Sequence, residues 1–230
     1  IIPARARSKR FPGKNVKQLC GKPVFQWTVE AAQAVPDIDN ICVSTDGEGI
    51  AELAVDLGVD VPFIRSRELS SDTASSVDVA CDVVEWYNRE RQAEFDYVIL
   101  LQPTSPLRTA EHIRGAISAL RHRDADAIVS VCPMSHSPLW ANTLPENDSM
   151  VGFLPDMAKG RRSQDLPTYF RLNGAIYIAR TERLLTDKSF LLPDACFAYR
   201  MPESASIDID SETDFRIAEA LLVKEGNASV

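Results

Sequence analysis

Five cationic side chains gather in one short stretch near the start of the chain. They follow the apolar pair Ile1-Ile2, and Pro12 and Gly13 interrupt the stretch. Arginine and lysine bind phosphate oxygens, and a glycine lets the backbone approach those oxygens closely. The stretch therefore predicts a loop that binds a polyphosphate, although a solvated basic turn would have the same composition. The five cations are Arg5, Arg7, Lys9, Arg10 and Lys14.

Two carboxylates stand close together near the other end of the chain, in Asp208-Ile209-Asp210. On an extended segment, side chains two residues apart point to the same side, so both carboxylates can face one divalent cation. Mg²⁺ typically takes one or two protein carboxylates and leaves its other positions to water and phosphate oxygens. The alternative is that Asp210 only caps the last helix and Asp208 is solvated. With the basic loop, the pair predicts Mg²⁺ or Mn²⁺ held beside a polyphosphate, as nucleotidyl transfer requires.

Composition narrows the classes of protein to consider. The 230 residues, 45% hydrophobic and 25% charged, fit one globular domain over 1–230. A net charge of −8 argues against a nucleic-acid partner, and five scattered cysteines without a Cys-x-x-Cys pair argue against a disulfide framework or a zinc site. No apolar run could span a bilayer, and no signal peptide is recognisable. We expect a cytoplasmic protein without a membrane partner, and a short leading segment before Ile1.

Hydrophobic periodicity predicts the elements that would position the basic loop and the acidic pair. Near-continuous apolar strands alternate with amphipathic helices, which indicates a Rossmann-like α/β fold with a mostly parallel sheet covered by helices on both faces. Ligands of such sheets bind beyond the carboxyl ends of the strands. The loops that begin at Arg5, Asp46, Arg65 and Gln102 should therefore converge. Helices are expected over 23–35, 47–57, 75–91, 110–121 and 212–223, and strands over 40–45, 61–65, 97–101, 127–131, 175–179 and 197–201.

The alternation breaks between residues 133 and 170. This segment, which we call the arm, contains five prolines and scattered apolar residues without a helical period. We expect it to leave the sheet as a small β-rich excursion. Such an arm cannot bury its apolar residues alone, whereas in a two-fold dimer each arm could pack on the other subunit.

Several motifs, in order along nearly the whole chain, resemble those of the CMP-sialic acid synthetases, or N-acylneuraminate cytidylyltransferases. The resemblance implies a fold of the nucleotide-diphospho-sugar transferase type and a homodimer that exchanges its arms. It also implies that the anomeric hydroxyl of a nine-carbon keto-acid sugar attacks the α-phosphate of CTP and releases diphosphate. The motifs are Ile2-Pro3-Ala4-Arg5 with Ser8-Lys9 and Lys14-Asn15, then Ser44-Thr45-Asp46, and the stretches 71–76, 101–108, 173–177 and 206–210.

The same resemblance implies roles for individual residues. It places Arg162 against the carboxylate of the sugar in the neighbouring subunit, with Arg161 as the alternative. The implied catalytic residues are Arg5, Lys9, Lys14, Asp208 and Asp210, of which the two aspartates hold the metal. The implied CTP-binding residues are Arg5, Ser8, Asn15, Arg65, Ser76 and Gln102. The implied sugar-binding residues are Gln102, Arg162, Asn173, Tyr177 and Phe190.

Departures from the motifs leave the sugar open. Arg10 stands where sialate enzymes often have glycine, and Trp140 stands where some have lysine. Residues 161–167 resemble relatives that activate legionaminic and pseudaminic acids, and 3-deoxy-manno-octulosonic acid is a further alternative. A metal-dependent glycosyltransferase would also use an Asp-x-Asp motif. A nucleotide-binding regulatory domain would not need every residue of catalytic type that this chain contains.

Overall fold

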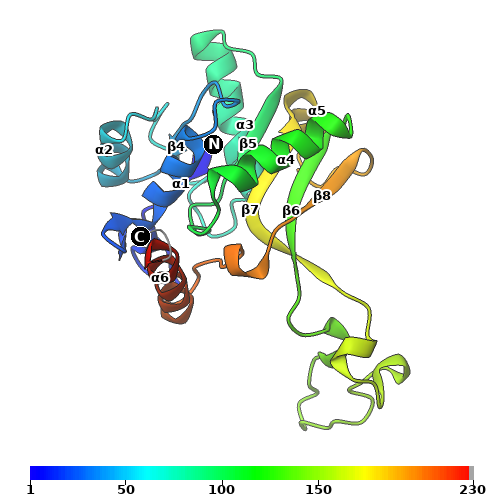
Figure 1. The fold of residues 1–230 in the computed structure, drawn as a ribbon. Coiled ribbons are helices and arrows are strands. Elements are labelled where there is room, and N and C mark those ends of the chain that lie inside the picture. Colours follow the sequence, from blue (N-terminus) through cyan, green and yellow to red (C-terminus); the bar gives the residue numbers. More distant parts are fainter. Residues whose placement is uncertain (228–230) are drawn as a thin grey trace.

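A twisted sheet with helices on both faces forms the body of the protein (Figure 1). The structure is a computed structural model, and it describes residues 1–227. In one half of the sheet, β1 (Ile2–Pro3) pairs in parallel with β4 (Val43–Ser44). Single parallel bridges then connect the residues that flank β4 to the segment 60–64 at the edge of the sheet.

The first residue connects this half of the sheet to the other. Ile1 N donates to Ile99 O at 2.7 Å, and Leu101 N donates to Ile1 O at 3.0 Å, which is the pattern of a parallel pair. Ile99 lies in β5, the first strand of a four-stranded sheet in the order β5-β7-β6-β8. These strands are β5 (Tyr97–Leu100), β6 (Ala127–Pro133), β7 (Phe170–Arg180) and β8 (Cys196–Arg200).

The predicted Rossmann-like, mostly parallel sheet is confirmed, with one reversed strand that the periodicity did not indicate. β7 is antiparallel to both β5 and β6, whereas β8 is parallel to β6. The chain leaves β6 at Pro133 and re-enters β7 at Phe170, and these two residues are register partners. The returning strand therefore runs back beside the strand that it has just left, as in a long hairpin.

Helices cover both faces of the sheet (Figure 1). On one face, α1, α2 and α4 bury apolar side chains such as Val29 and Ile113 against Ile176 and Ile178 of β7. On the other face, α3 and α5 pack on the same sheet through a second cluster. Among the described helices, none is long and apolar enough to cross a membrane. The helices are α1 (Val24–Gln33), α2 (Glu48–Asp56), α3 (Ser76–Trp86), α4 (Ala110–His122), α5 (Thr181–Asp187) and α6 (Glu212–Asn227).

A separate small core fixes the last helix next to the basic loop. Phe215 of α6 packs in one cluster with Leu19 and Val24 near the start of α1, and Ile209 is fully buried in the same cluster. Leu19 belongs to a short antiparallel hairpin of β2 (Gln18–Leu19) and β3 (Lys22–Pro23). Because Ile209 is held in this core, the aspartates on either side of it lie close to the loop that follows β1.

The arm extends far from the body of the protein (Figure 1). Its base is a continuation of the β6–β7 pair, and Met134 N donates to Tyr169 O at 2.9 Å. Beyond this point the described residues form turns and coil, so the prediction of a β-rich arm is wrong. Prolines lack the N–H that a strand ladder needs, and the arm contains five of them. Short 3₁₀ turns occur at Pro138–Trp140, Asp156–Ala158 and Ser163–Asp165.

Candidate active site

A cavity of about 370 Å³ lies beyond the carboxyl ends of β1 and β5. Five segments contribute to its wall: the loop after β1, the segment 65–76, the loop after β5, the bend at Gly174 in β7, and the acidic pair. The structure thus brings together most of the residues whose roles the sequence suggested. The predicted site residues that line the cavity are Arg5, Ser8, Lys14, Asn15, Arg65, Ser76, Gln102, Tyr177, Asp208 and Asp210.

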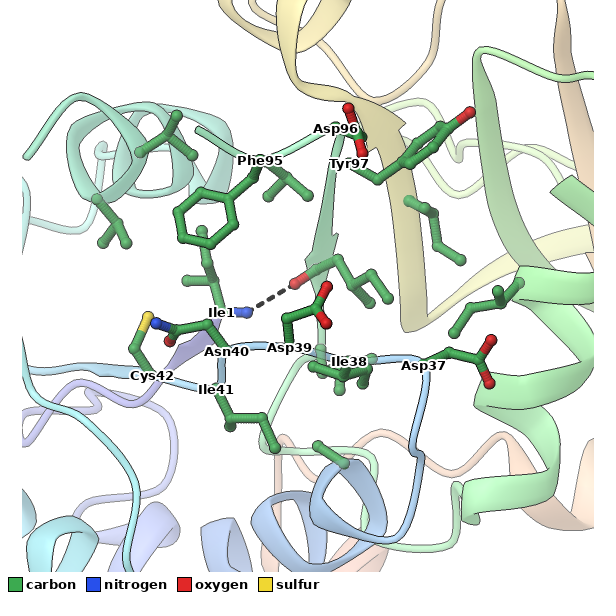
Figure 2. Close-up of a pocket in the computed structure, with 18 of the residues that line it drawn as sticks. Ile1, Asp37, Ile38, Asp39, Asn40, Ile41, Cys42, Phe95, Asp96 and Tyr97 are labelled. Carbon is green, nitrogen blue, oxygen red and sulfur yellow. Dashed lines mark hydrogen bonds between the residues drawn. The ribbon is translucent and has the colours of Figure 1, made fainter. Parts of the chain in front are cut away.

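A second cavity, of about 450 Å³, lies at the opposite ends of the same strands (Figure 2). Its wall is mainly apolar, and Asp37 and Asp39 stand at one side of it. Arg121 is the one cationic side chain in the described wall. Ligands of α/β sheets bind at the carboxyl ends of the strands, and this cavity lacks a cluster of cations that could hold phosphates. We therefore assign the chemistry to the smaller cavity.

Side chains from other segments hold the basic loop in place. Asp46 Oδ1 accepts a hydrogen bond from Ala6 N at 2.7 Å, and Asn15 Nδ2 donates to Arg5 O at 2.8 Å. Gly13, at a φ of 69°, begins the 3₁₀ turn Lys14–Val16 that directs Lys14 back toward the cavity. Asp46 does not line the cavity itself. The sequence indicated a convergent loop there, but not that its aspartate would anchor the loop after β1.

Gly47 allows the closest approach between these two loops. A Cβ at Gly47 would lie 2.6 Å from Ala6 Cβ, closer than real atoms approach. We expect Gly47→Ala to displace the basic loop and to weaken binding of a polyphosphate ligand by on the order of tenfold, because a small displacement misaligns the cations that would contact the ligand. The matched control is Gly49→Ala in the same helix, where an added Cβ would meet nothing within 4 Å. Equal affinity of the two variants for a nucleoside triphosphate would show that the spacing of these loops does not affect ligand binding.

The basic loop contacts the acidic pair directly. Lys14 Nζ lies 2.9 Å from Asp210 Oδ1 and donates to Ile209 O at 2.8 Å, and Arg10 Nη1 lies 2.9 Å from Asp210 Oδ2. Asp210 does not cap the last helix, because Ser211 and Asp214 cap it reciprocally through their side chains and main-chain amides. The alternative interpretation of the aspartates as a helix cap is therefore wrong for Asp210.

Asp208 is a partly buried carboxylate in the wall of this cavity. Burial raises its pKa above the usual range for aspartate, and repulsion from Asp210 adds to this effect, while a hydrogen bond from Thr104 and the charge of Lys14 oppose it. Its Oδ1 is buried and has no hydrogen-bond partner among the described residues. A buried carboxylate oxygen without a donor is unfavourable unless it binds a cation. The residues present thus fit a divalent ion between the two aspartates.

Further polar groups in the wall of this cavity are placed to bind a ligand. Gln102 Nε2 donates to Ser76 Oγ at 2.9 Å. Arg65 is almost fully buried, its Nε donates to Ser70 Oγ at 3.2 Å, and burial lowers its pKa. The buried atoms Asn15 Oδ1 and Ser8 Oγ have no hydrogen-bond partner in the described part of the chain. These groups are therefore available to a ligand.

A family model described as Cytidylyltransferase matches residues 1–221. The chain belongs to the cytidylyltransferase family. It is 37% identical over 228 residues to the CMP-N,N'-diacetyllegionaminic acid synthase of Legionella pneumophila, with 96% of this chain and 94% of that protein covered. It is also 30% identical to the pseudaminic acid cytidylyltransferase of Campylobacter jejuni, with coverage of 96% and 94%.

Two further comparisons support the assignment of family and fold. The N-acylneuraminate cytidylyltransferase of Streptococcus agalactiae serotype V is 39% identical over 220 residues, and this chain spans about half (51%) of its length. A solved structure of CMP:2-keto-3-deoxy-manno-octonic acid synthetase complexed with CTP superimposes with a TM-score of 0.70, 19% identity and 97% coverage of both chains. The protein is therefore a nucleotidyltransferase of Rossmann-like fold.

Asp72 belongs to the motif at 71–76 but was not among the predicted site residues, and it contacts two predicted catalytic residues of this cytidylyltransferase. Arg5 Nη1 lies 3.1 Å from Asp72 Oδ1, and Lys9 Nζ lies 2.5 Å from Asp72 Oδ2. The hydrogen bond from Lys9 lowers the pKa of Asp72, so the carboxylate is ionised and faces the basic loop. Lys9 is largely exposed and does not line the cavity. The motif that contains Lys9 correctly indicated the basic loop, but a motif does not show in which direction a side chain points.

Three predicted sugar-binding residues lie outside the cavity. Asn173 is 1% exposed, and its amide bonds to Ser130 Oγ at 2.6 Å and Ser206 Oγ at 2.8 Å. In the described chain it therefore connects β6, β7 and the segment before Asp208, and its contact with a sugar stays a prediction. Phe190 is buried behind Tyr177, with ring centroids 5.7 Å apart. Arg162 lies on the arm and pairs with Asp165 at 3.0 Å.

Removing the Asn173 amide should destabilise the cytidylyltransferase. Asn173→Ala leaves the buried hydroxyl of Ser130 without its acceptor, so the free energy of unfolding should fall by about 1–3 kcal/mol. Urea unfolding measures this loss, and Asn88→Ala, at an exposed position, is the control that should not change it. If Asn173→Ala has unchanged stability and only its KM for the sugar rises, the structural role is contradicted. That result would instead support direct contact between Asn173 and the sugar.

Proposed function

We propose that the protein activates a nonulosonic, sialic-type acid: CTP plus an N-acylneuraminate gives the CMP-sugar and diphosphate. The observation that carries the proposal is the contact of Lys14 with Asp210 at 2.9 Å, because it joins phosphate-binding cations and an acidic pair in one cavity. Relatives of high coverage are named for legionaminic and pseudaminic acids, and another for N-acylneuraminate. Legionaminic, pseudaminic and 3-deoxy-manno-octulosonic acids are the alternative acceptors.

The reaction is a displacement at phosphorus. The anomeric oxygen of the sugar forms a bond to the α-phosphorus, and the proton of that hydroxyl passes to water. The bond from the α-phosphorus to the oxygen that bridges it to the β-phosphate breaks, and diphosphate leaves with the electron pair. Arg5 and Lys14 bind the triphosphate and stabilise the charge that develops on the leaving group. Gln102 and Ser76 orient the nucleoside beside the sugar, and Tyr177 borders the sugar. Most of the catalysis in this scheme comes from positioning and electrostatics.

We propose Mg²⁺ or Mn²⁺ as the cofactor. Asp208 and Asp210 would hold the ion, and the partner-free buried Oδ1 of Asp208 supports this assignment. When bound, the ion neutralises phosphate charge and polarises the phosphoryl oxygens. Across the described residues no cluster of three or more histidine, cysteine, aspartate or glutamate side chains could hold a metal. Two carboxylates suffice for an ion that also binds phosphates.

We further propose a homodimer in which each arm reaches the cavity of the other subunit. The arm exposes apolar side chains to an unusual degree, with Val151 at 95%, Met150 at 61% and Leu144 at 55%. Within one chain, the arm extends away from the body of the protein that carries the cavity (Figure 1). In the exchanged arrangement, Arg162 would bind the carboxylate of the sugar through its planar fork.

A cytoplasmic location is part of the proposal. All five cysteines are free thiols, as a reducing compartment permits. Three of them, Cys42, Cys81 and Cys132, are buried as small core residues.

A substrate panel tests the reaction. CTP is supplied with N-acetylneuraminic, legionaminic, pseudaminic or 3-deoxy-manno-octulosonic acid, and diphosphate release is measured with and without Mg²⁺. We expect release that depends on CTP, on Mg²⁺ and on a nine-carbon acid. If diphosphate is released only with the eight-carbon octulosonic acid, the proposed nine-carbon substrate is wrong and the eight-carbon acid takes its place. Consumption of a CMP-sugar without diphosphate release from CTP would favour a glycosyltransferase.

A further inference from the structure

A buried arginine supports the cavity from behind. Arg108 is the bulkiest of the fully buried side chains in the described chain, at 1% exposure. It lies in the loop between β5 and α4, where two successive turns bring its side chain inward: Ser105 N donates to Gln102 O, and Arg108 N donates to Ser105 O. It does not line the cavity.

The guanidinium of Arg108 connects two separate segments. Nη1 donates to Gln102 O at 3.1 Å and to Ala175 O at 2.9 Å. Gln102 follows β5 and carries the amide that bonds Ser76, on the nucleoside side of the cavity. Ala175 lies in β7 next to Gly174, which lines the cavity as Tyr177 does. One side chain therefore fixes the spacing between the nucleoside wall and the wall expected to face the sugar.

The loop that Arg108 holds also supports the acidic pair. Ile209 N donates to Thr104 O at 2.8 Å, and Thr104 gives Asp208 a side-chain hydrogen bond. Thr104 is two residues from Gln102 in the same loop. A shift of this loop would therefore move the nucleoside contact and the expected metal ligand together.

A purely structural role would not require a charged side chain at this position. Within the described residues, Arg108 has no carboxylate partner, and its Nε and Nη2 have no hydrogen-bond partner. Burial lowers its pKa to about 9, so it remains protonated at neutral pH. A buried charge without a counter-ion is unfavourable, and an apolar side chain of similar length would often give equal or greater stability. A buried cation without a counter-ion at this position therefore points to a benefit for the site itself.

We propose that Arg108 is a positioning residue, which uses its hydrogen bonds to the carbonyls of Gln102 and Ala175 to align the nucleotide with the sugar. The proposal rests on the proposed function for its effect on turnover. Its effect on CTP binding depends only on Gln102 and Ser76 contacting the nucleotide.

The first test compares Arg108→Met with wild type. Methionine keeps the apolar stem and removes the donors and the charge, so we expect unchanged or higher melting temperature. We also expect kcat to fall by on the order of a hundredfold, because misalignment of two reactants lowers turnover steeply. Arg108→Lys keeps a charged donor and should recover part of kcat. Wild-type kcat and CTP affinity in folded Arg108→Met would overturn the proposal.

A double-mutant cycle tests whether Arg108 acts through Gln102. The Kd for CTP is measured by calorimetry for Arg108→Met, Gln102→Ala and the combination. We expect Arg108→Met to weaken CTP binding about tenfold alone and much less in the Gln102→Ala background, since coupled residues are not additive. Fully additive losses would assign Arg108 an independent structural role. If Arg108→Met does not fold, the same cycle with Arg108→Lys gives the answer, and additivity or wild-type behaviour there rejects the proposal.

A control variant and the calorimetric measurement distinguish failure of the proposed role of Arg108 from failure of the proposed function. Arg183→Met removes an arginine paired with Asp126, Asp187 and Asp194 away from the cavity, and should change stability but not kcat or Kd. If wild type binds CTP but uses none of the sugars, the proposed function fails while the CTP cycle still tests Arg108. If wild type is active and the cycle is additive, only the role of Arg108 fails.

Discussion

Replacement of either aspartate of the acidic pair by asparagine is expected to reduce kcat by on the order of a hundredfold or more. Asparagine preserves the shape of the side chain but removes one anionic ligand, and the metal-borne stabilisation of the transition state is worth several kcal/mol. Diphosphate release is measured as Mg²⁺ is titrated, and the variants should require far more Mg²⁺. Near-normal activity of both Asp208→Asn and Asp210→Asn at limiting Mg²⁺ would refute the metal assignment.

The two substitutions should differ in their effects on stability. Because folding raises the pKa of Asp208, the carboxyl contributes most to stability when protonated, and this contribution is lost as the pH rises through the folded pKa. Without metal, Asp208→Asn should therefore melt at or above the wild-type temperature at neutral pH, and the difference should shrink as the pH falls. Asp210→Asn instead loses its ion pairs with Lys14 and Arg10 and should gain nothing.

An aspartate outside the active-site cavity provides the control for this experiment. Asp37 pairs with Arg121 on the surface, so Asp37→Asn removes an ion pair of similar type away from the acidic pair. Exposed pairs contribute little, about 0–1 kcal/mol, and the activity of this variant should be that of wild type. A large loss of activity in Asp37→Asn would mean that the assay reports general damage instead of chemistry.

Two inactive variants should regain activity when they are combined in one dimer, if the arms are exchanged between subunits. Arg162→Ala lacks the expected carboxylate ligand, and Asp210→Asn lacks one of the two proposed metal ligands. When they are unfolded and refolded together, half of the dimers should be mixed, and each mixed dimer then has one complete site. About one quarter of all sites should recover activity. If Arg162 serves its own subunit, neither site of a mixed dimer is complete.

The complementation experiment needs proof of mixing. Subunits carrying two different affinity tags allow the mixed dimers to be isolated and assayed directly. Inactive mixed dimers would reject the exchanged arm. The same experiment with Arg161→Ala identifies which of the two adjacent arginines completes the site. In the structure Arg162 forms an ion pair with Asp165, and this ion pair would have to break before Arg162 could bind the carboxylate of the sugar.

Local patterns were sufficient to predict much of this protein. The basic loop after β1 and the Asp208-Ile209-Asp210 segment were recognisable because charge, glycine and spacing are properties of neighbouring residues. The alternation of apolar strands and amphipathic helices predicted the α/β sheet. Burial of one helix face leaves a helical period in the sequence, and burial of both strand faces leaves a continuous apolar run. The helix α5 went unpredicted, since seven residues make two turns and leave too short a period.

The remaining features depend on contacts between distant residues. Lys14 and Asp210 are 196 residues apart, and only the packing of Ile209 with Leu19 and Val24 brings them together. The reversed direction of β7 follows from the return of the arm, which has no signature in the strand itself. Asn173 belongs to a motif of the site, yet its register in β7 turns its amide into the core.

The sequence alone thus determined the fold class and the family, and it predicted the chemistry of the loop and the acidic pair. Tertiary structure decided which of these side chains share a cavity, that Asp46 and Asp72 engage the basic loop, and that Arg108 lies behind the cavity wall. The physical reason is that residue type and spacing specify what a side chain can do. Burial, strand direction and close approach, which set where it acts, arise only when segments far apart in the chain pack together.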